Sequence, residues 1–197
     1  SSSQLERLDL GSIFIQKPLI LSFPKDNEIF PLLQKFPKLK SLSFETPFTT
    51  SESYQLKSYD YLKRLSINST SFMVMAKALK VEMIEYLSLV FPDRISEDSY
   101  YKLFRILKDF KGLRYLVTSS QLENGDKIKN LLGTFFIMCH SFPKLMVLHA
   151  NWDRIMLSEE EVRAFRSFLP CGKFLKEVLI NFFVLSITRS PNGTYVL

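Results

Sequence analysis

The chain has 197 residues, of which 46% are hydrophobic and 14% aromatic, and its formal net charge is +6. This composition excludes intrinsic disorder, because so apolar a chain of this length can bury roughly 70% of its unfolded surface on folding. The chain has only two cysteines, too few for a disulfide framework, so we expect free, buried thiols. We expect one domain over residues 1–197.

The sequence shows neither a secretory signal nor a membrane span. A transmembrane helix needs about 20 apolar residues, and the longest uncharged apolar runs, 131–139 and 178–187, are shorter. We therefore expect an intracellular protein of the cytoplasm or nucleus, without membrane contact. Because the chain starts without Met and ends on an apolar segment, we also expect it to be part of a longer protein.

A six-residue phrase recurs along the chain, and in most copies its first, fourth and sixth residues are apolar. The copies lie at 5–10, 39–44, 62–67, 84–89, 113–118, 145–150 and 175–180. From the second copy onward, successive phrases begin 23, 22, 29, 32 and 30 residues apart. Because side chains alternate along a strand, the fourth and sixth residues share one face. Each phrase therefore predicts a short strand, and parallel stacking of the strands predicts one shared core.

Helical spacing of apolar residues between the phrases predicts return paths on one side of the sheet. We expect helices at 29–36, 72–79, 96–110, 128–139 and 158–169. Ser96 is suited to be the N-cap of the third helix, and Ser158 with Glu161 forms a capping box at the fifth. Prolines shortly after three of these helices prevent their continuation.

A second recurring motif joins helix to strand. Phe36-Pro37-Lys38-Leu39 and Phe142-Pro143-Lys144-Leu145 occupy the same place in their units, and the segments 110–113 and 171–175 are variants with glycine. Proline or glycine at this place ends a helix and turns the chain toward the strand. The motif keeps register with the strand phrase, which indicates a series of similar units.

The segment 140–148, His-Ser-Phe-Pro-Lys-Leu-Met-Val-Leu, resembles the helix-to-strand junction of long leucine-rich repeats. These repeats are of the ribonuclease-inhibitor-like kind, which includes the repeats of F-box substrate receptors, and the resemblance covers about residues 29–182. It implies an α/β leucine-rich-repeat solenoid, a curved parallel sheet with helices on the convex side. The Asn or Cys that follows the strand in many such repeats is mostly absent, although Asn68 and Asn151 lie near that place. The units are therefore degenerate.

The two ends of the chain fit the repeat pattern less well, as is usual for terminal units. We expect an irregular capping unit over residues 1–28 and repeats over 29–182. Residues 183–197 form either a C-terminal hairpin or the start of a further repeat. The Asn-Gly pair at 192–193 favours the tight turn of a hairpin.

The sequence predicts no catalytic site, metal site or cofactor. His140 and His149 are the only histidines, and no motif places an acid or a nucleophile beside them. His140 suits a helix C-terminus, where a cation is favoured, and the acidic run 159–161 suits a helix N-terminus. Two Cys and two His at these spacings do not match a zinc site. We therefore do not expect an enzyme.

The residues that flank the core positions of each phrase predict the exposed face of the strands. This face carries serines in the early units and larger side chains in the later ones, and we place Asn68 on it as well. Tyr, Trp and Arg are enriched at binding hot spots. The candidate partner-binding residues are Arg64, Tyr86, Tyr115, His149, Asn151 and Trp152. For Trp152 alone, the alternative is that it covers the core behind a loop.

Two function classes follow from this surface and from the charge. The first, also implied by the resemblance, is a noncatalytic protein-interaction scaffold that binds partners through the strand face and adjacent loops. It would act in a multi-subunit complex, such as the substrate-recognition part of a ubiquitin ligase. The alternative is a basic nucleic-acid-associated module in RNA processing, RNA export or chromatin, because a net positive charge favours polyanions. Its lysines and arginines are scattered, and the aromatic residues follow the core period.

Overall fold

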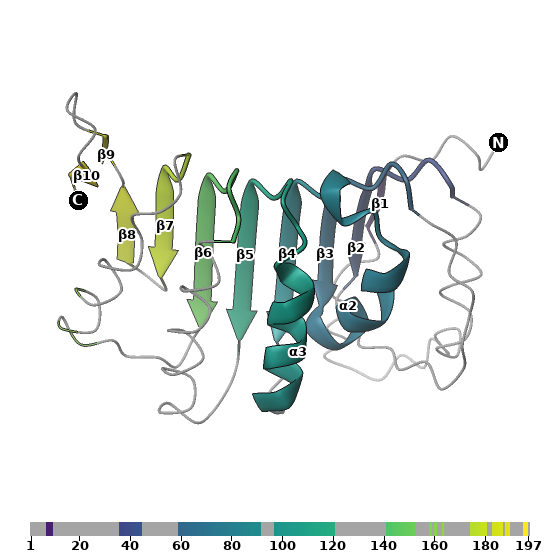
Figure 1. Cartoon of the computed structure of the whole chain (residues 1–197), viewed down its shortest axis with the longest axis horizontal. Helices are drawn as coiled ribbons and strands as arrows, with labels where there is room; N and C mark the ends of the chain where they lie inside the picture. Colours follow the sequence, from purple (N-terminus) through teal and green to yellow (C-terminus); the bar gives the residue numbers. More distant parts are fainter. Residues whose placement is uncertain are drawn as a thin grey trace, which may run out of the picture.

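A computed structural model describes about half of the chain. The described residues are 7–9, 36–44, 59–91, 97–120, 141–152, 158, 160, 163, 174–180, 183–186, 188–189 and 195–196. Within them the protein is an α/β structure built on one large sheet (Figure 1). Residues 29–35 of the helix expected at 29–36 lie outside the described residues, and Phe36 is not helical. The helix expected at 128–139, most of 158–169, His140 and both cysteines also lie outside them.

Eight of the described strands form this sheet in the order of the sequence (Figure 1). They are β1 (Arg7–Asp9), β2 (Ser41–Phe44), β3 (Arg64–Asn68), β4 (Tyr86–Phe91), β5 (Tyr115–Ser120), β6 (Val147–Trp152), β7 (Glu177–Ile180) and β8 (Phe183–Ser186). Neighbours from β1 to β7 pair in parallel, and each of these strands begins within one of the recurring phrases. The strand prediction from the phrase is therefore confirmed.

The C-terminal strands pair differently. β8 joins the large sheet antiparallel to β7, with Ile180 opposite Phe183. β9 (Thr188–Arg189) and β10 (Tyr195–Val196) pair antiparallel in a separate two-stranded sheet. The parallel series therefore ends at β7.

The register of the parallel strands places equivalent residues of the phrases side by side. The fourth residues of the phrases are buried in successive strands: Leu42, Leu65, Leu87, Leu116, Leu148 and Val178. The first residues are buried as well: Leu39, Leu62, Ile84, Leu113, Leu145 and Leu175. These two rows belong to one continuous hydrophobic core, as the parallel stacking of the phrases predicts.

The turn before each strand is also repeated. The carbonyl oxygen of Lys40 accepts hydrogen bonds from the N–H groups of Lys63 (2.9 Å) and Arg64 (3.1 Å) in the next unit. Four further carbonyl oxygens accept two N–H groups of the following unit in the same way, those of Lys63, Glu85, Arg114 and Met146. In the two Phe-Pro-Lys-Leu tetrapeptides the leucine N–H donates to the phenylalanine carbonyl oxygen at 3.2 Å. Identical local sequence thus gives the same turn.

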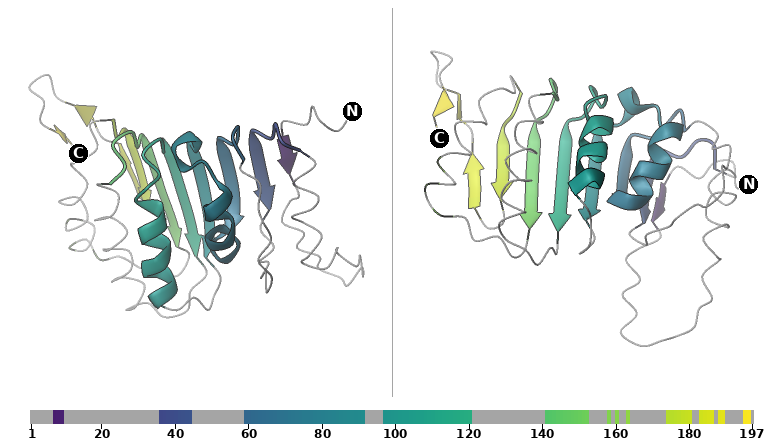
Figure 2. Two further views of the ribbon diagram at one scale, coloured as in Figure 1. Left: turned by 45° about the vertical axis from the view of Figure 1, so that its right-hand side comes forward. Right: turned by 60° about the horizontal axis from the view of Figure 1, so that its bottom comes forward.

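The described helices α2 (Ser69–Met75) and α3 (Glu97–Leu107) lie on one face of the sheet (Figure 2). Every third or fourth residue of α3 is apolar, and its inner face buries Tyr100, Leu103, Phe104 and Leu107, within the segment predicted at 96–110. The segment predicted at 72–79 differs from the prediction. Its helix begins at Ser69, and after Met75 the chain continues as the 3₁₀-helix η3 (Ala76–Ala78). A further 3₁₀-helix, η4 (Val81–Met83), leads into the turn before β4.

The prediction that Asn68 lies on the exposed strand face is wrong. Its side chain is not on the exposed face; the residue is 4% exposed and forms the N-cap of α2. The Asn68 Oδ1 atom accepts a hydrogen bond from the Thr70 N–H at 2.9 Å. Because β3 runs directly into α2, the last residue of the strand has to satisfy the first free N–H groups of the helix.

We expect Asn68→Ala to lower the free energy of unfolding by about 1 kcal/mol, because the Thr70 N–H loses its acceptor. Asn68→Ser keeps a capping oxygen, so its loss should be smaller. Urea denaturation followed by circular dichroism measures both. Equal losses in the two variants would contradict the capping role.

Among the described residues, no helix is long and apolar enough to cross a membrane.

Candidate functional site

The strand face that is not covered by α2 and α3 carries two rows of outward side chains. The first row consists of Ser41, Arg64, Tyr86, Tyr115, Val147 and Glu177, in register from β2 to β7. The second consists of Ser43, Ser66, Ser88, Val117, His149 and Leu179. All of them are exposed or half-buried, whereas the residue between the two rows in each strand is buried. This alternation is the one that the strand phrase predicts.

Three of the predicted site residues form one cluster. Because β3, β4 and β5 are neighbours in register, Arg64, Tyr86 and Tyr115 lie side by side in the first row. The Arg64 guanidinium carbon lies 4.8 Å from the centre of the Tyr86 ring, a cation–π contact. The Tyr86 and Tyr115 rings are 6.3 Å apart between centroids and tilted by 37°. Tyr115 stays 38% exposed, so the cluster presents aromatic surface to solvent.

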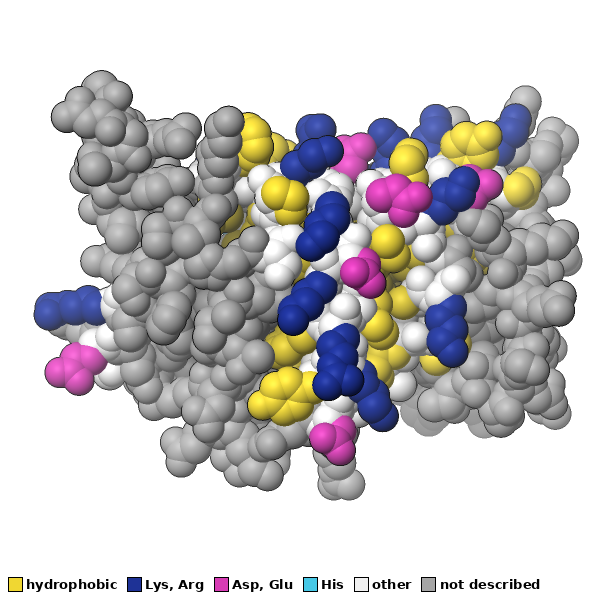
Figure 3. Space-filling model, viewed as in Figure 1, with side chains coloured by type: hydrophobic (Ala, Val, Ile, Leu, Met, Phe, Trp, Pro, Cys, Tyr) yellow, Lys and Arg dark blue, Asp and Glu magenta, His cyan; other side chains and the backbone are white. Residues whose placement is uncertain are grey.

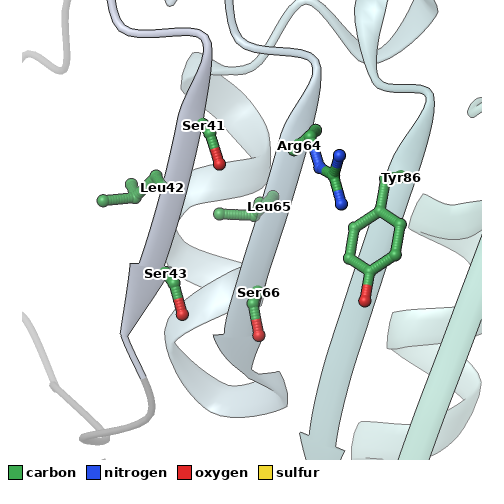
Figure 4. Close-up of a pocket in the computed structure, with 7 residues that line it drawn as sticks. All are labelled: Ser41, Leu42, Ser43, Arg64, Leu65, Ser66 and Tyr86. Carbon is green, nitrogen blue, oxygen red and sulfur yellow. The ribbon is translucent and has the colours of Figure 1, made fainter. Parts of the chain in front are cut away.

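A hollow of about 410 Å³ lies beside this cluster, over β2, β3 and β4. Its described lining consists of Ser41, Leu42, Ser43, Arg64, Leu65, Ser66 and Tyr86 (Figure 4). Figure 4 shows the serine hydroxyls, the Arg64 side chain and the Tyr86 ring on the side of the strands away from the helices. The hollow exists because the small side chains of Ser41, Ser43 and Ser66 lie next to the large Arg64 and Tyr86 side chains of the first row.

His149 lies one row away from the cluster and has an acidic partner. Its Nε2 atom lies 2.6 Å from the Glu177 Oε1 atom, diagonally across β6 and β7. Both side chains are partly exposed, at 30% and 47%. The register places Val117 and Leu179 on either side of His149, and neither carries a nucleophile. The pair suits a polar contact point at the β7 end of the strand face.

The remaining two predicted site residues lie at the end of β6. Asn151 is exposed, two residues beyond His149, and opposite Ser119 in the register. Trp152 is the last residue of β6, and its backbone pairs with Ser120. Its side chain is not among those that the structure describes. The structure thus brings Arg64, Tyr86 and Tyr115 together and places His149 and Asn151 two strands from Tyr86.

The turns at the start of the strands carry a network of opposite charges. Glu85 lies between two basic residues: its Oε1 atom is 3.0 Å from Lys63 Nζ and its Oε2 atom is 3.9 Å from Arg114 Nε. The hydrogen bond from Lys63 holds the pKa of Glu85 below its ordinary value, and the charges of Lys63, Arg114 and Lys144 add to this effect. Asp60 and Lys80 form a further pair at 2.9 Å. Glu85 therefore pairs with the basic residues of the turns and not with Arg64.

The opposite face of the molecule is basic along α3. Figure 3 shows Lys and Arg side chains over this helix. Lys102, Arg105 and Lys108 are exposed there, with the acidic residues Asp98 and Asp109 interspersed. The pattern is that of a solvated helix face with an excess of positive charge.

Within the described residues, no group of three or more His, Cys, Asp or Glu side chains could hold a metal ion. The fold and the strand face define the class: a parallel-sheet α/β protein whose sheet follows the sequence order and presents an Arg–Tyr–Tyr cluster beside a serine-lined hollow. No protein-family model matches the chain, and neither the curated proteins nor the solved structures compared with it provide a match.

Proposed function

We propose that the chain is a leucine-rich-repeat solenoid that acts as a noncatalytic protein-binding scaffold in a multi-subunit complex. The repeat identity is supported by the in-register parallel strands, the buried leucine rows and the carbonyl that accepts two N–H groups at each turn. A stack of such units has an extended strand face, and proteins of this kind use that face for binding.

The observation that carries the proposal is the exposed Arg64–Tyr86–Tyr115 cluster. Its rings and guanidinium are held by contacts with one another, so they lose little side-chain entropy when a partner binds. Tyr and Arg are the residue types that dominate binding energy at protein interfaces. The ubiquitin-ligase role that the resemblance implies would use the same surface.

We expect Tyr86→Ala combined with Tyr115→Ala to reduce partner binding at least tenfold, because both rings of the cluster are removed. The measurement is quantitative mass spectrometry of proteins retained from a lysate of the source cell by the immobilised chain and by the variant. Ligase subunits among the proteins that are lost would identify the ubiquitin-ligase role.

The matched control is Tyr61→Ala combined with Tyr101→Ala. These tyrosines are 54% and 49% exposed but lie off the strand face, in the turn before β3 and on α3. The control should retain the same proteins as the unchanged chain. Retention that is unaffected by the cluster variant, in a protein that melts at the same temperature, would contradict the proposal.

The second candidate function is binding of nucleic acid by the basic face of α3. It is favoured by the exposed Lys102, Arg105 and Lys108. Charge reversal of Arg105, Lys108, Lys111 and Arg114 should then abolish retention on heparin or RNA. If the charge-reversed chain also fails to retain the proteins of the lysate, while the tyrosine variant still retains them, that result would favour the nucleic-acid function over the scaffold function.

A further inference from the structure

We infer that the serine-lined hollow beside Arg64 binds a carboxylate side chain, so that the partner of the strand face presents an acidic, extended segment. This inference rests on the proposed function and specifies the chemistry of the partner at one end of the strand face. The argument combines the lining of the hollow, the state of Arg64 and the distribution of charge along the face.

The described lining of the hollow contains hydroxyls and a cation but no carboxylate. Ser41, Ser43 and Ser66 are the hydroxyl residues, and Arg64 is the cation. Serine hydroxyls donate hydrogen bonds, and a guanidinium carries five N–H donors in a planar fork that matches a carboxylate. A neutral apolar occupant would leave these donors without partners, which costs binding energy.

Arg64 is held in place, and the described residues supply no anion that pairs with it. The cation–π contact with the Tyr86 ring holds the guanidinium in place and uses none of its N–H donors in a hydrogen bond to an anion. Among the described residues, no carboxylate pairs with it; Glu85, the acid that directly precedes Tyr86, is held by Lys63 and Arg114 instead. A cation held in place without an anion is complementary to an anion supplied by a partner.

The charge along the first row favours one orientation of such a segment. Arg64 stands on β3, and the acid of this row, Glu177, stands on β7, where it contacts His149. Four strand spacings separate the two, on the order of 19 Å. Within the first row, an acidic side chain is therefore attracted to the β3 end and repelled from the β7 end. In the second row, the register places the acid Asp9 of β1 beside Ser43. Tyr86 and Tyr115 lie between the two ends of the first row and provide apolar contact.

The hollow also fits the occupant in size. Its volume of about 410 Å³ lies over Ser41 and Ser43 of β2 and Ser66 of β3. This space holds one or two side chains of a peptide, whereas a folded domain would have to reach it with a protruding segment. An extended segment that crosses the strands places alternate side chains toward the face and satisfies this geometry.

The test uses the full 197-residue chain and an amidated octapeptide that alternates Glu and Ser, labelled with fluorescein. We expect fluorescence anisotropy to show binding at low salt, and ¹⁵N chemical-shift changes at Ser41, Ser43, Arg64 and Ser66. The same peptide with Gln in place of Glu should bind at least fivefold more weakly. Equal binding of the Glu and Gln peptides would overturn the inference.

Variants locate the binding to the hollow. Arg64→Gln should weaken binding of the Glu peptide at least fivefold, and Ser66→Leu, which fills the hollow, should do the same. The matched control is Lys77→Gln, which removes one positive charge at an exposed side chain outside the lining. It should change the affinity less than twofold. A larger effect of the control than of Arg64→Gln would show general charge attraction and overturn the inference.

Two outcomes separate the inference from the proposed function. In the first outcome, the tyrosine variant loses the retained proteins, whereas Arg64→Gln and Ser66→Leu keep them and bind the Glu peptide as tightly as the unchanged chain does. The scaffold function then stands, and the carboxylate site is wrong. If an oligouridine RNA of eight nucleotides binds the hollow and the Glu peptide does not, the occupant is a nucleic acid and the inference is wrong. Thermal melting of each variant confirms that it is folded.

Discussion

Replacing Leu116 with alanine is expected to lower the free energy of unfolding by about 2–5 kcal/mol. Leu116 is fully buried in β5, between Leu87 of β4 and Leu148 of β6 in the register. The substitution removes apolar contacts and leaves a cavity beside β4 and β6. These strands cannot move in to fill it, because each pairs with a further strand on its other side. Urea denaturation followed by tryptophan fluorescence and circular dichroism measures the loss.

The matched control for Leu116 is the next residue. Val117 is half-buried on the strand face, so Val117→Ala should cost less than about 1 kcal/mol. The two substitutions differ by one position along the same strand and therefore test the alternation of faces directly. If Val117→Ala costs as much as Leu116→Ala, the assignment of the two faces of β5 is wrong.

The strands could be predicted from the sequence because each one carries the same short signal. An isolated run of leucine, two other residues and leucine is weak evidence, but the copies keep their junctions in register, which excludes chance spacing. The pairing of equivalent residues follows from this, since stacked units with equal phrases place Leu65 beside Leu87 and Leu87 beside Leu116.

The helix after β3 was harder to predict because its start is set by a single cap. The apolar spacing of Phe72, Met75 and Leu79 places a helix at 72–79 but does not locate its first turn. Asn68 follows an apolar strand residue directly, so strand alternation and helix capping compete for it. The hydrogen bond to Thr70 decides in favour of the cap. An Asn followed by Ser-Thr-Ser was the signal for this outcome.

The sequence predicts which residues of the candidate site are neighbours, but it does not predict the shape of the site. Alternation and register together put Arg64, Tyr86 and Tyr115 in one row. The hollow depends on the volumes of side chains in two rows, and the His149–Glu177 contact depends on a diagonal approach across β6 and β7. The sequence pattern predicts which residues face outward, whereas side-chain packing determines which of them meet.

Gly112→Ala is expected to lower the free energy of unfolding by about 1–3 kcal/mol. A Cβ atom at this position would overlap the carbonyl oxygen of Glu82, which belongs to the backbone of η4 and cannot rotate away. The substitution would therefore force the turn before β5 away from the turn before β4. Since Arg114 and Tyr115 donate to the Glu85 carbonyl oxygen across the same junction, we expect those bonds to weaken as well.

The turn before β6 shows that this requirement comes from the approach of η4 and not from the recurring helix-to-strand motif. The tetrapeptide Phe110-Lys111-Gly112-Leu113 forms the same turn as Phe142-Pro143-Lys144-Leu145, and there an exposed lysine takes the place of the glycine. Lys144→Ala is thus the matched control, and its cost should stay within about 0.5 kcal/mol. Equal costs at the two positions would show that the approach of η4 does not constrain Gly112. A large difference would show that irregular units lock together through contacts specific to one junction.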